Sequence, residues 1–437
     1  MGDDRLRGED WIYFDALCAV LHKDIYSHTS SGHREEGKWW VSPGDFAKEV
    51  TEEFHFPRQI QILDTTLRDG EQEAGIIFTK EDKLAIAKKL DEAGVHRIEA
   101  GCPATSEEDA EALKEICAAG LKAEIYCFVR GVLSDMDLAK ACGVDGVLIE
   151  IPGSEHMLSG GMRWTPEKAV EAAIASTRYA HDLGLKVTYF PSDGSRASLD
   201  FLIDLLNKIL DGGGWMDSVA LVDTFGTFSP EGAAYYTRAL LERVGKPVEA
   251  HFHEDFGLSV ATTIASLKAG AFCAHVTVNG IGERAGSCPI EALVMSLLCL
   301  YGQDTGIKTE NLIGLAKEVE VRSGKPTPPT KAIVGDRLFG WETGLPVGYW
   351  QKAKDINPLI MLPYLYTMTG QNPPHIYIGK KSGGANVALV NERLGLPAVE
   401  DKEAVKEILA KVKDLSIAKK RDLTDEEYIR IYHEVIG

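Results

Sequence analysis

Short apolar runs rich in β-branched and aromatic residues recur along the middle of the chain, and amphipathic stretches separate them. This alternation predicts buried strands joined by helices. We predict eight strands, at Gln59–Asp64, His96–Ala100, Ala123–Phe128, Gly146–Ile151, Lys186–Phe190, Ser218–Asp223, Val248–His253 and His275–Val278.

The stretches between these strands carry apolar residues at helical spacing, and several begin with a residue that caps a helix, such as Thr79, Ser106, Thr165 and Ser229. The helices are predicted at Lys80–Ala93, Thr105–Ala118, Leu133–Ala141, Pro166–Leu183, Leu199–Leu210, Pro230–Val244 and Ser259–Ala269. Eight strands alternating with helices over about 220 residues predict an α/β fold of the (β/α)8 TIM-barrel class. A doubly wound open sheet is the rival, but the segment after the first strand, Arg68–Gln72, is not a phosphate-binding glycine fingerprint.

Segments of different character flank the predicted barrel, which we place at residues 58–322. The N-terminal extension, 1–57, holds Trp11, Tyr13, Trp39 and Trp40, and is too aromatic for a typical disordered tail, so we expect it to pack on the barrel or on a partner subunit. The run Gly324–Thr330, which contains three prolines, predicts a stiff linker. Residues 323–437 therefore form a linker and a mixed C-terminal subdomain.

Composition narrows the classes of partner. The net charge of −19 and the pI near 5.1 disfavour nucleic acids and anionic membranes, which are polyanions. The eight cysteines show no CxxC spacing, which is typical of reduced thiols in a cytoplasm. A basic, apolar leader is missing, and no apolar run approaches the roughly 18 to 20 residues that span a bilayer. We therefore expect a cytoplasmic protein that acts on small molecules.

Two segments about 180 residues apart together predict a divalent-metal site. His251 and His253 alternate along a strand, so both imidazoles face one side while Phe252 faces the other. Asp69, after the first strand, can add a carboxylate. In a barrel all three lie at the C-terminal mouth, where active sites occur. Two nitrogens and one oxygen with open positions suit a catalytic zinc, manganese or magnesium ion. The alternative is a strand that carries two histidines with structural roles.

Motifs matching in order from the first strand to the eighth resemble one enzyme family. They are Leu63–Gln72, Ile98–Gly101, Asp223-Thr224, His251–Leu258 and Val278–Gly286. These segments look like the metal-dependent barrel synthases that make isopropylmalate, homocitrate and citramalate, with hydroxymethylglutaryl-CoA lyase as a more distant relative.

The resemblance implies a Claisen condensation of acetyl-CoA, or a related acyl-CoA, with a 2-oxo acid. The products would be free CoA and a 2-hydroxy dicarboxylic or tricarboxylic acid, as in amino-acid biosynthesis. A divalent ion on Asp69, His251 and His253 would chelate the keto and carboxylate oxygens of the oxo acid. The resemblance further implies a homodimer, because the region after the barrel helps to complete the neighbouring subunit's site in relatives.

The same resemblance implies roles for further residues. Arg68, Glu283 and Arg284 are expected to be catalytic, with Arg68 stabilising the oxyanion and the other two in the glycine-rich loop Gly280–Gly286. Those expected to bind substrate are Gln72, Arg130, His156 and Thr224.

Three positions depart from the family pattern. Ser192 stands where synthases have a glutamate after strand five, Ser287 where several have an asparagine, and Pro346 where a histidine assists deprotonation of acetyl-CoA. The sequence therefore leaves open a lyase or aldolase that cleaves a hydroxy acid or its CoA ester. It also leaves open a barrel that binds an oxo acid without turning it over.

Overall fold

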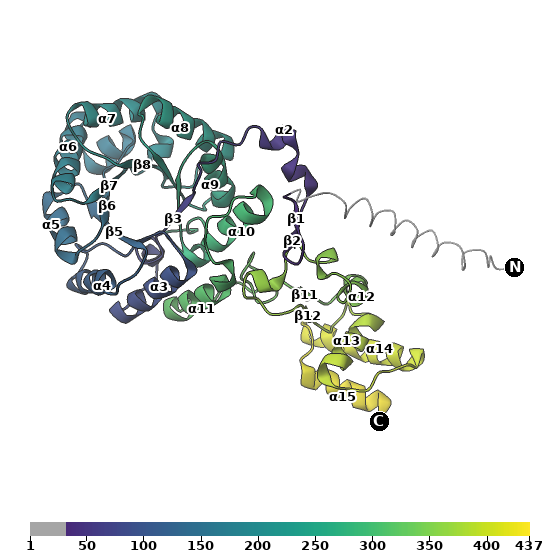
Figure 1. The fold of residues 1–437 in the computed structure, drawn as a ribbon. Coiled ribbons are helices and arrows are strands. Elements are labelled where there is room, and N and C mark those ends of the chain that lie inside the picture. The colour runs from purple at the N-terminus through teal and green to yellow at the C-terminus, as the bar shows by residue number, and fades with distance from the viewer. Residues whose placement is uncertain (1–31) are drawn as a thin grey trace.

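A closed barrel of parallel strands dominates the computed structural model, which describes residues 32–437 (Figure 1). Neighbouring strands follow the order β10-β3-β4-β5-β6-β7-β8-β9, and β10 closes the sheet on β3. The strands are β3 Gln61–Asp64, β4 Arg97–Glu99, β5 Glu124–Arg130, β6 Gly146–Glu150, β7 Lys186–Phe190, β8 Ser218–Asp223, β9 Val248–Phe252 and β10 Cys273–Val276. The predicted (β/α)8 barrel is confirmed, and all eight predicted strands are present.

Helices surround the barrel and pack on its outer face (Figure 1). They are α3 Lys80–Ala93, α4 Glu107–Ala118, α5 Leu133–Cys142, α6 Pro166–Asp182, α7 Leu199–Asp211, α8 Pro230–Arg243, α9 Ser259–Lys268, α10 Ile290–Tyr301 and α11 Leu312–Ser323. The four predicted capping residues each accept a hydrogen bond from a backbone N–H of the first helical turn, which satisfies a donor that the helix itself leaves free.

Alternation along each strand separates two sets of side chains. In β9, Val248, Ala250 and Phe252 face outward into the large core between sheet and helices, while Glu249 and His251 face the barrel interior. The same period places Tyr126, Leu148, Phe190 and other apolar residues inside the barrel as a smaller cluster. The expectation that Phe252 faces away from its two histidine neighbours is confirmed.

A buried ionic network crosses the barrel interior near the N-terminal ends of the strands. The carboxylate of Glu249 lies 3.0 Å from Nη1 of Arg97 and 2.7 Å from Nε2 of His275, and it accepts hydrogen bonds from Ser218 and Thr188. Burial alone would raise its pKa, but Arg97 and the hydrogen bonds from His275 and Ser218 hold the pKa of Glu249 below its ordinary value. Cys273 and His275 make this a second group of metal-ligating types. Because Arg97 already neutralises the carboxylate of Glu249, we interpret this group as structural and not as a metal site.

The segments outside the barrel pack on one another. A hairpin of β1 Arg34–Glu35 and β2 Trp39–Trp40 precedes η1 Pro43–Phe46 and α2 Lys48–Thr51. The backbone of Trp40 donates to Pro363, and that of Leu365 donates to Lys38, so the hairpin is joined to the C-terminal region. The rings of Phe54 and Phe56 then contact the ring of Tyr301 in α10, the first tilted and the second edge to face. The extension thus contacts both the barrel and the C-terminal region. Trp11 and Tyr13 lie outside the described residues.

After α11, the chain from Gly324 to Phe339 contains neither helix nor strand, as the prolines predicted. The C-terminal region then comprises β11 Gly340–Trp341, α12 Gly344–Ala353, η7 Pro358–Ile360, η8 Tyr366–Met368, β12 His375–Ile376, α13 Gly384–Leu394, α14 Lys402–Lys419 and α15 Asp425–Ile436. It lies beside the barrel in Figure 1, with β11 and β12 paired in parallel. The domain limits at 57/58 and 322/323 stay predictions.

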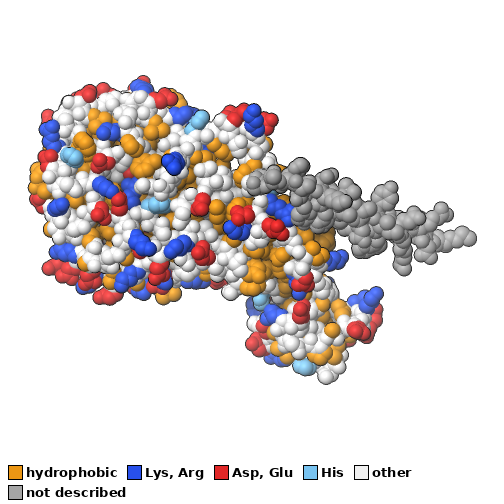
Figure 2. Space-filling model, in the orientation of Figure 1, with side chains coloured by type: hydrophobic (Ala, Val, Ile, Leu, Met, Phe, Trp, Pro, Cys, Tyr) orange, Lys and Arg blue, Asp and Glu red, His pale blue; other side chains and the backbone are white. Residues whose placement is uncertain are grey.

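The surface and the cysteines agree with the composition. Acidic and basic side chains are interspersed on the face shown in Figure 2. All seven cysteines in the described part of the chain are free thiols. None of the helices from residue 32 onward combines the length and apolar character that crossing a bilayer requires.

We expect Glu249→Gln to lower the free energy of unfolding by roughly 3–5 kcal/mol, because it leaves Arg97 buried without its counter-charge. Denaturant unfolding at pH 7 measures this loss. Glu124→Gln, which removes an exposed partner of Lys186, is the matched control and should stay near wild type. Since the folded pKa of Glu249 lies below the ordinary 4.5, its stabilisation is present above about pH 4.5 and is lost as pH falls further. Equal stability of the two variants would contradict this role.

Candidate active site

Three predicted metal ligands meet at the C-terminal mouth of the barrel. Asp69 lies in the loop after β3, His251 lies in β9, and His253 follows that strand directly. Their ligand atoms lie within 4.8 Å of one another, and all three side chains are buried. The imidazole rings of His251 and His253 are edge to face, 5.2 Å apart. One carboxylate oxygen and two imidazole nitrogens form an open set suited to a divalent ion.

Ser287 joins two of these ligands. Its hydroxyl donates to Oδ2 of Asp69 at 2.5 Å and lies 3.3 Å from Nδ1 of His253, while the carbonyl of Gly286 lies 3.2 Å from the same nitrogen. Because Nδ1 of His253 is engaged on this side, its Nε2 is the nitrogen left to bind a metal. A backbone bridge between His253 and Ser287 holds this arrangement. Sequence reasoning noted Ser287 only as a replacement for asparagine.

His251 is chemically prepared to be a ligand. Burial lowers its pKa well below the ordinary value, and the neighbouring His253, His275 and Arg68 lower it further. Its imidazole is therefore neutral at pH 7, and a neutral imidazole has a lone pair available for a metal.

Arg68 is fixed beside the ligands by polar contacts of its guanidinium nitrogens and by an aromatic ring. Nη2 lies 2.9 Å from the carboxylate of Glu99, and Nη1 donates to Gln72 at 3.1 Å. The guanidinium carbon stands 4.6 Å from the centre of the Phe128 ring. Burial raises the pKa of Glu99 to about 7, although Arg68 opposes this rise. Arg68 is thus a cation held in one place, 3.7 Å from the carboxylate of Asp69.

A second carboxylate at the mouth escaped the sequence analysis. Glu150 ends β6 and accepts a hydrogen bond from the hydroxyl of Ser192, which follows β7. Burial raises the pKa of Glu150, while the Ser192 hydrogen bond and Arg68 oppose the rise. The period of two along β6 was the available signal, because it places Glu150 on the same interior face as Leu148.

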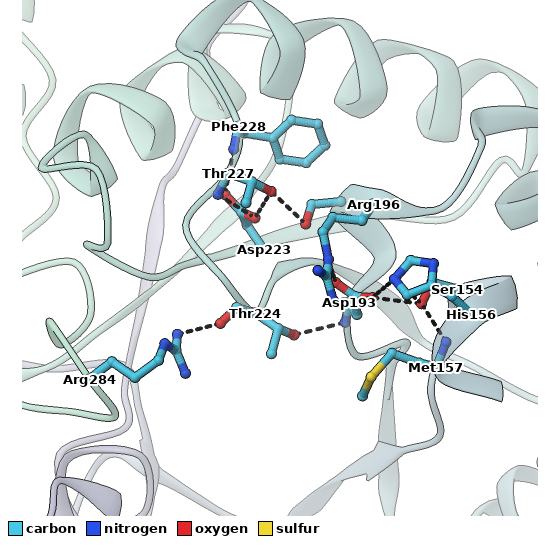
Figure 3. Close-up of polar contacts among 11 residues, drawn as sticks. Ser154, His156, Met157, Asp193, Arg196, Asp223, Thr224, Thr227, Phe228 and Arg284 are labelled. Carbon is cyan, nitrogen blue, oxygen red and sulfur yellow. Dashed lines mark hydrogen bonds and ion pairs between the residues drawn. The ribbon is translucent and has the colours of Figure 1, made fainter. Parts of the chain in front are cut away.

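Thr224, expected to bind the substrate carboxylate, is held by Asp193 (Figure 3). Its hydroxyl oxygen accepts from the backbone N–H of Asp193 at 2.7 Å, so its own hydrogen remains available to donate. The carboxylate of Asp193 is in turn bound by Ser154 at 2.6 Å, by Nε2 of His156 at 2.6 Å and by two nitrogens of Arg196. His156 is therefore brought next to this group, with its side chain half exposed.

The glycine-rich loop after β10 is anchored by Arg284. This arginine donates to Asp255 at 2.9 and 3.0 Å and to the carbonyl of Thr224 at 2.5 Å, as Figure 3 shows for Thr224. Glu283 lies 3.3 Å from Arg284 and is half exposed. At Gly286, which has φ +95°, a Cβ would lie 1.9 Å from the Gly280 carbonyl, so this loop closes only with glycine.

Arg130, at the end of β5, is paired with a neighbouring helix. Its guanidinium binds the carboxylate of Asp135 in α5 at 2.8 and 2.9 Å, and its side chain is 61% exposed. Arg130 is thus an exposed, paired arginine at the rim of the mouth.

The HMGL-like family model matches residues 59–319, which is more than half of the chain. The chain belongs to the HMGL-like family. Homocitrate synthase of Methanopyrus kandleri is 38% identical over 90% of this chain and 96% of that protein. A probable 2-isopropylmalate synthase of Ignicoccus hospitalis is 40% identical, with coverage of 83% and 88%. The (R)-citramalate synthase of Methanocaldococcus jannaschii is 39% identical, with coverage of 86% and 75%.

Solved structures agree on the fold. Hydroxymethylglutaryl-CoA lyase of Bacillus subtilis superposes with a TM-score of 0.55 at 20% identity, covering 62% of this chain and 96% of that chain. The lyase of Pseudomonas aeruginosa also gives 0.55, at 21% identity. The resemblance read from the motifs is thereby confirmed: the chain is an HMGL-like barrel similar to three kinds of synthase.

We expect His251→Gln to weaken Mn²⁺ or Zn²⁺ binding by more than about 100-fold, because it removes a ligand, and Ser287→Ala to weaken it by roughly 10-fold, because it releases Asp69 and His253. Isothermal titration calorimetry on metal-stripped protein measures both affinities. His433→Gln, at an exposed position in α15, is the control and should bind as wild type. Unchanged affinity in His251→Gln would remove this site from consideration.

Proposed function

We propose that this protein catalyses a divalent-metal-dependent Claisen condensation of acetyl-CoA, or a related acyl-CoA, with a 2-oxo acid. The observation that carries the proposal is the meeting of Asp69, His251 and His253 with Arg68 at the barrel mouth. The similar synthases support the same reaction type. The product would be a 2-hydroxy acid with an added carboxymethyl group, and a role in amino-acid biosynthesis is in keeping with those relatives.

The ligand set fits zinc, manganese or magnesium, and a bound ion would supply Lewis acidity toward the oxygens of the oxo acid. Thr224 contributes a hydroxyl donor for the substrate carboxylate, since its oxygen already accepts from Asp193. Gln72 accepts a hydrogen bond from Nη1 of Arg68 and so helps to hold that guanidinium in position.

Arg68 would stabilise the negative oxygen that develops when the acetyl carbanion adds to the ketone. A guanidinium does not deprotonate at neutral pH, and here it is prevented from moving by Glu99, Gln72 and Phe128. A preorganised charge of this kind lowers the barrier because it needs no reorientation as charge develops.

The loop that contains Glu283 and Arg284 would cover the substrate. Since Arg284 binds the carbonyl of Thr224, the position of the loop is coupled to that of the carboxylate-binding hydroxyl. His156 would contact the parts of the substrates farther from the metal, whereas Arg130, at the same mouth, is engaged by Asp135.

A metal-dependent lyase or aldolase is the second candidate, favoured by Pro346 and Ser192. Pro346 lies in the first turn of α12 and cannot act as a base. Two other groups of the C-terminal region that could deprotonate acetyl-CoA, Glu342 and Tyr364, are already engaged. Glu342 accepts from the backbone of Lys381, and Tyr364 is buried against Phe339. Cleavage of hydroxy acids or their CoA esters without an added acceptor would support this reading.

Thiol release tests the condensation directly. Metal-loaded protein with acetyl-CoA and pyruvate, 2-oxoisovalerate, 2-oxoglutarate, oxaloacetate or glyoxylate should release CoA with at least one acceptor, and chelation should abolish it. We expect Arg68→Ala to lower kcat by about 100- to 1000-fold. Arg243→Ala, an exposed arginine paired with Asp200, is the control. No release of CoA with any of these acceptors would refute the proposal and favour the cleavage reaction.

We further propose a homodimer in which the C-terminal region completes the neighbouring site. Gel filtration with light scattering should give about twice the 47.7 kDa of one chain. A monomer with full activity would contradict this assembly.

A further inference from the structure

The order of strands fixes which side of the mouth receives the side chain of the oxo acid, an inference that rests on the proposed function. The metal ligands come from β3 and β9, and Thr224 follows β8. These three strands lie on one side of the closed barrel, together with β10. Strands β5, β6 and β7 lie across from them. An acceptor held by its keto and carboxylate oxygens therefore directs its side chain toward β5, β6 and β7.

The wall on that side is mainly aromatic. Phe128 of β5 and Phe190 of β7 contact each other edge to face at 5.6 Å, and Phe190 also lies 5.0 Å from the ring of His251. Both phenyl rings face the barrel interior together with Leu148. An apolar substituent on the acceptor would be well accommodated here.

Glu150 adds a carboxylate to this wall, and no salt bridge joins it to a cation among residues 32–437. Its hydrogen-bond donor is the hydroxyl of Ser192, which is neutral. Arg68 opposes the rise in the pKa of Glu150, but that guanidinium is already paired with Glu99. A second carboxylate brought near Glu150 would be repelled by its like charge, unless one of the two groups took up a proton.

The cations of the neighbouring loops are committed elsewhere. Arg130, at the end of β5, binds Asp135, and Arg196, after β7, binds Asp193 through two nitrogens. The loop after β6 carries Arg163, which is exposed to solvent. The three loops, 131–132, 151–165 and 191–198, contain no lysine. A dicarboxylic acceptor would thus find no buried, unpaired cation on this wall, within the part of the chain that the structure describes.

We propose that the acceptor is a 2-oxo acid with a single carboxylate and an uncharged side chain, and that Glu150 excludes dicarboxylic 2-oxo acids. In chemical terms, pyruvate and 2-oxoisovalerate belong to the accepted class, and 2-oxoglutarate and oxaloacetate to the excluded one. Glu150 is then a specificity-determining residue, and Ser192 positions its carboxylate.

The test compares kcat/KM for 2-oxoisovalerate and 2-oxoglutarate on Mn²⁺-loaded protein with acetyl-CoA. Wild type should prefer the monocarboxylic acid, and Glu150→Gln should reduce that preference by roughly tenfold or more, mainly by lowering KM for 2-oxoglutarate. Glu155→Gln, which removes one charge from an exposed position in the loop after β6, should keep the wild-type preference.

Binding gives a readout independent of turnover and of any variant. Calorimetric titration of each oxo acid into Mn²⁺-loaded wild type, without acetyl-CoA, should show tighter binding of the monocarboxylic acid. A preference for 2-oxoglutarate in wild type, or an unchanged preference in folded Glu150→Gln, would overturn the inference while condensation still stood. Absence of thiol release with every acceptor would overturn the proposed function, and the binding comparison would still decide the inference.

Discussion

Closure of the sheet between β10 and β3 is the constraint on which the site depends. Four residue pairs, from Cys273 with Gln61 to Val276 with Asp64, join the first and last strands. Hydrogen bonds then tie the chain just beyond both strands, because the backbone N–H of Thr65 donates to Val276 and that of Val278 donates to the hydroxyl of Thr66. This closure brings Asp69, after β3, against Ser287, after β10. Without it the carboxylate and the two imidazoles would not share one centre.

The barrel interior is unusually rich in charge for a protein core. Arg97 with Glu249 lies toward the lower end, and Arg68 with Glu99 lies toward the mouth. Burying ions costs free energy, and such pairs contribute little net stability compared with apolar side chains of similar volume. These ion pairs fix the position of each arginine. An arginine that is bound to a carboxylate inside the barrel cannot swing its guanidinium out into solvent. Glu150 contrasts with these pairs, because this partly buried carboxylate accepts its hydrogen bond from a neutral hydroxyl, that of Ser192.

The pattern of the sequence predicted the strands, most helix boundaries and the meeting of Asp69, His251 and His253 at one rim, because each depends on local periodicity or on the shared rim of parallel strands. His251 and His253 needed only the period of two, and Asp69 only its place after β3. Contacts between segments far apart in the sequence could not be predicted from local periodicity. Ser287 meets Asp69 across 218 residues, and Ser192 meets Glu150 across 42, so both depend on how loops approach in space. Contact of Arg130 with substrate stays a prediction, and its pairing with Asp135, five positions further along the chain, is a contact that periodicity does not describe.

The proposed chemistry depends on one metal centre formed by Asp69, His251 and His253. Anomalous diffraction at the manganese edge, from crystals grown with Mn²⁺ and 2-oxoisovalerate, tests this centre most directly. We expect one strong peak between the three side chains, with keto and carboxylate oxygens of the acid completing the coordination. A peak at Glu249, Cys273 and His275 instead, or an acid bound away from the metal, would contradict it.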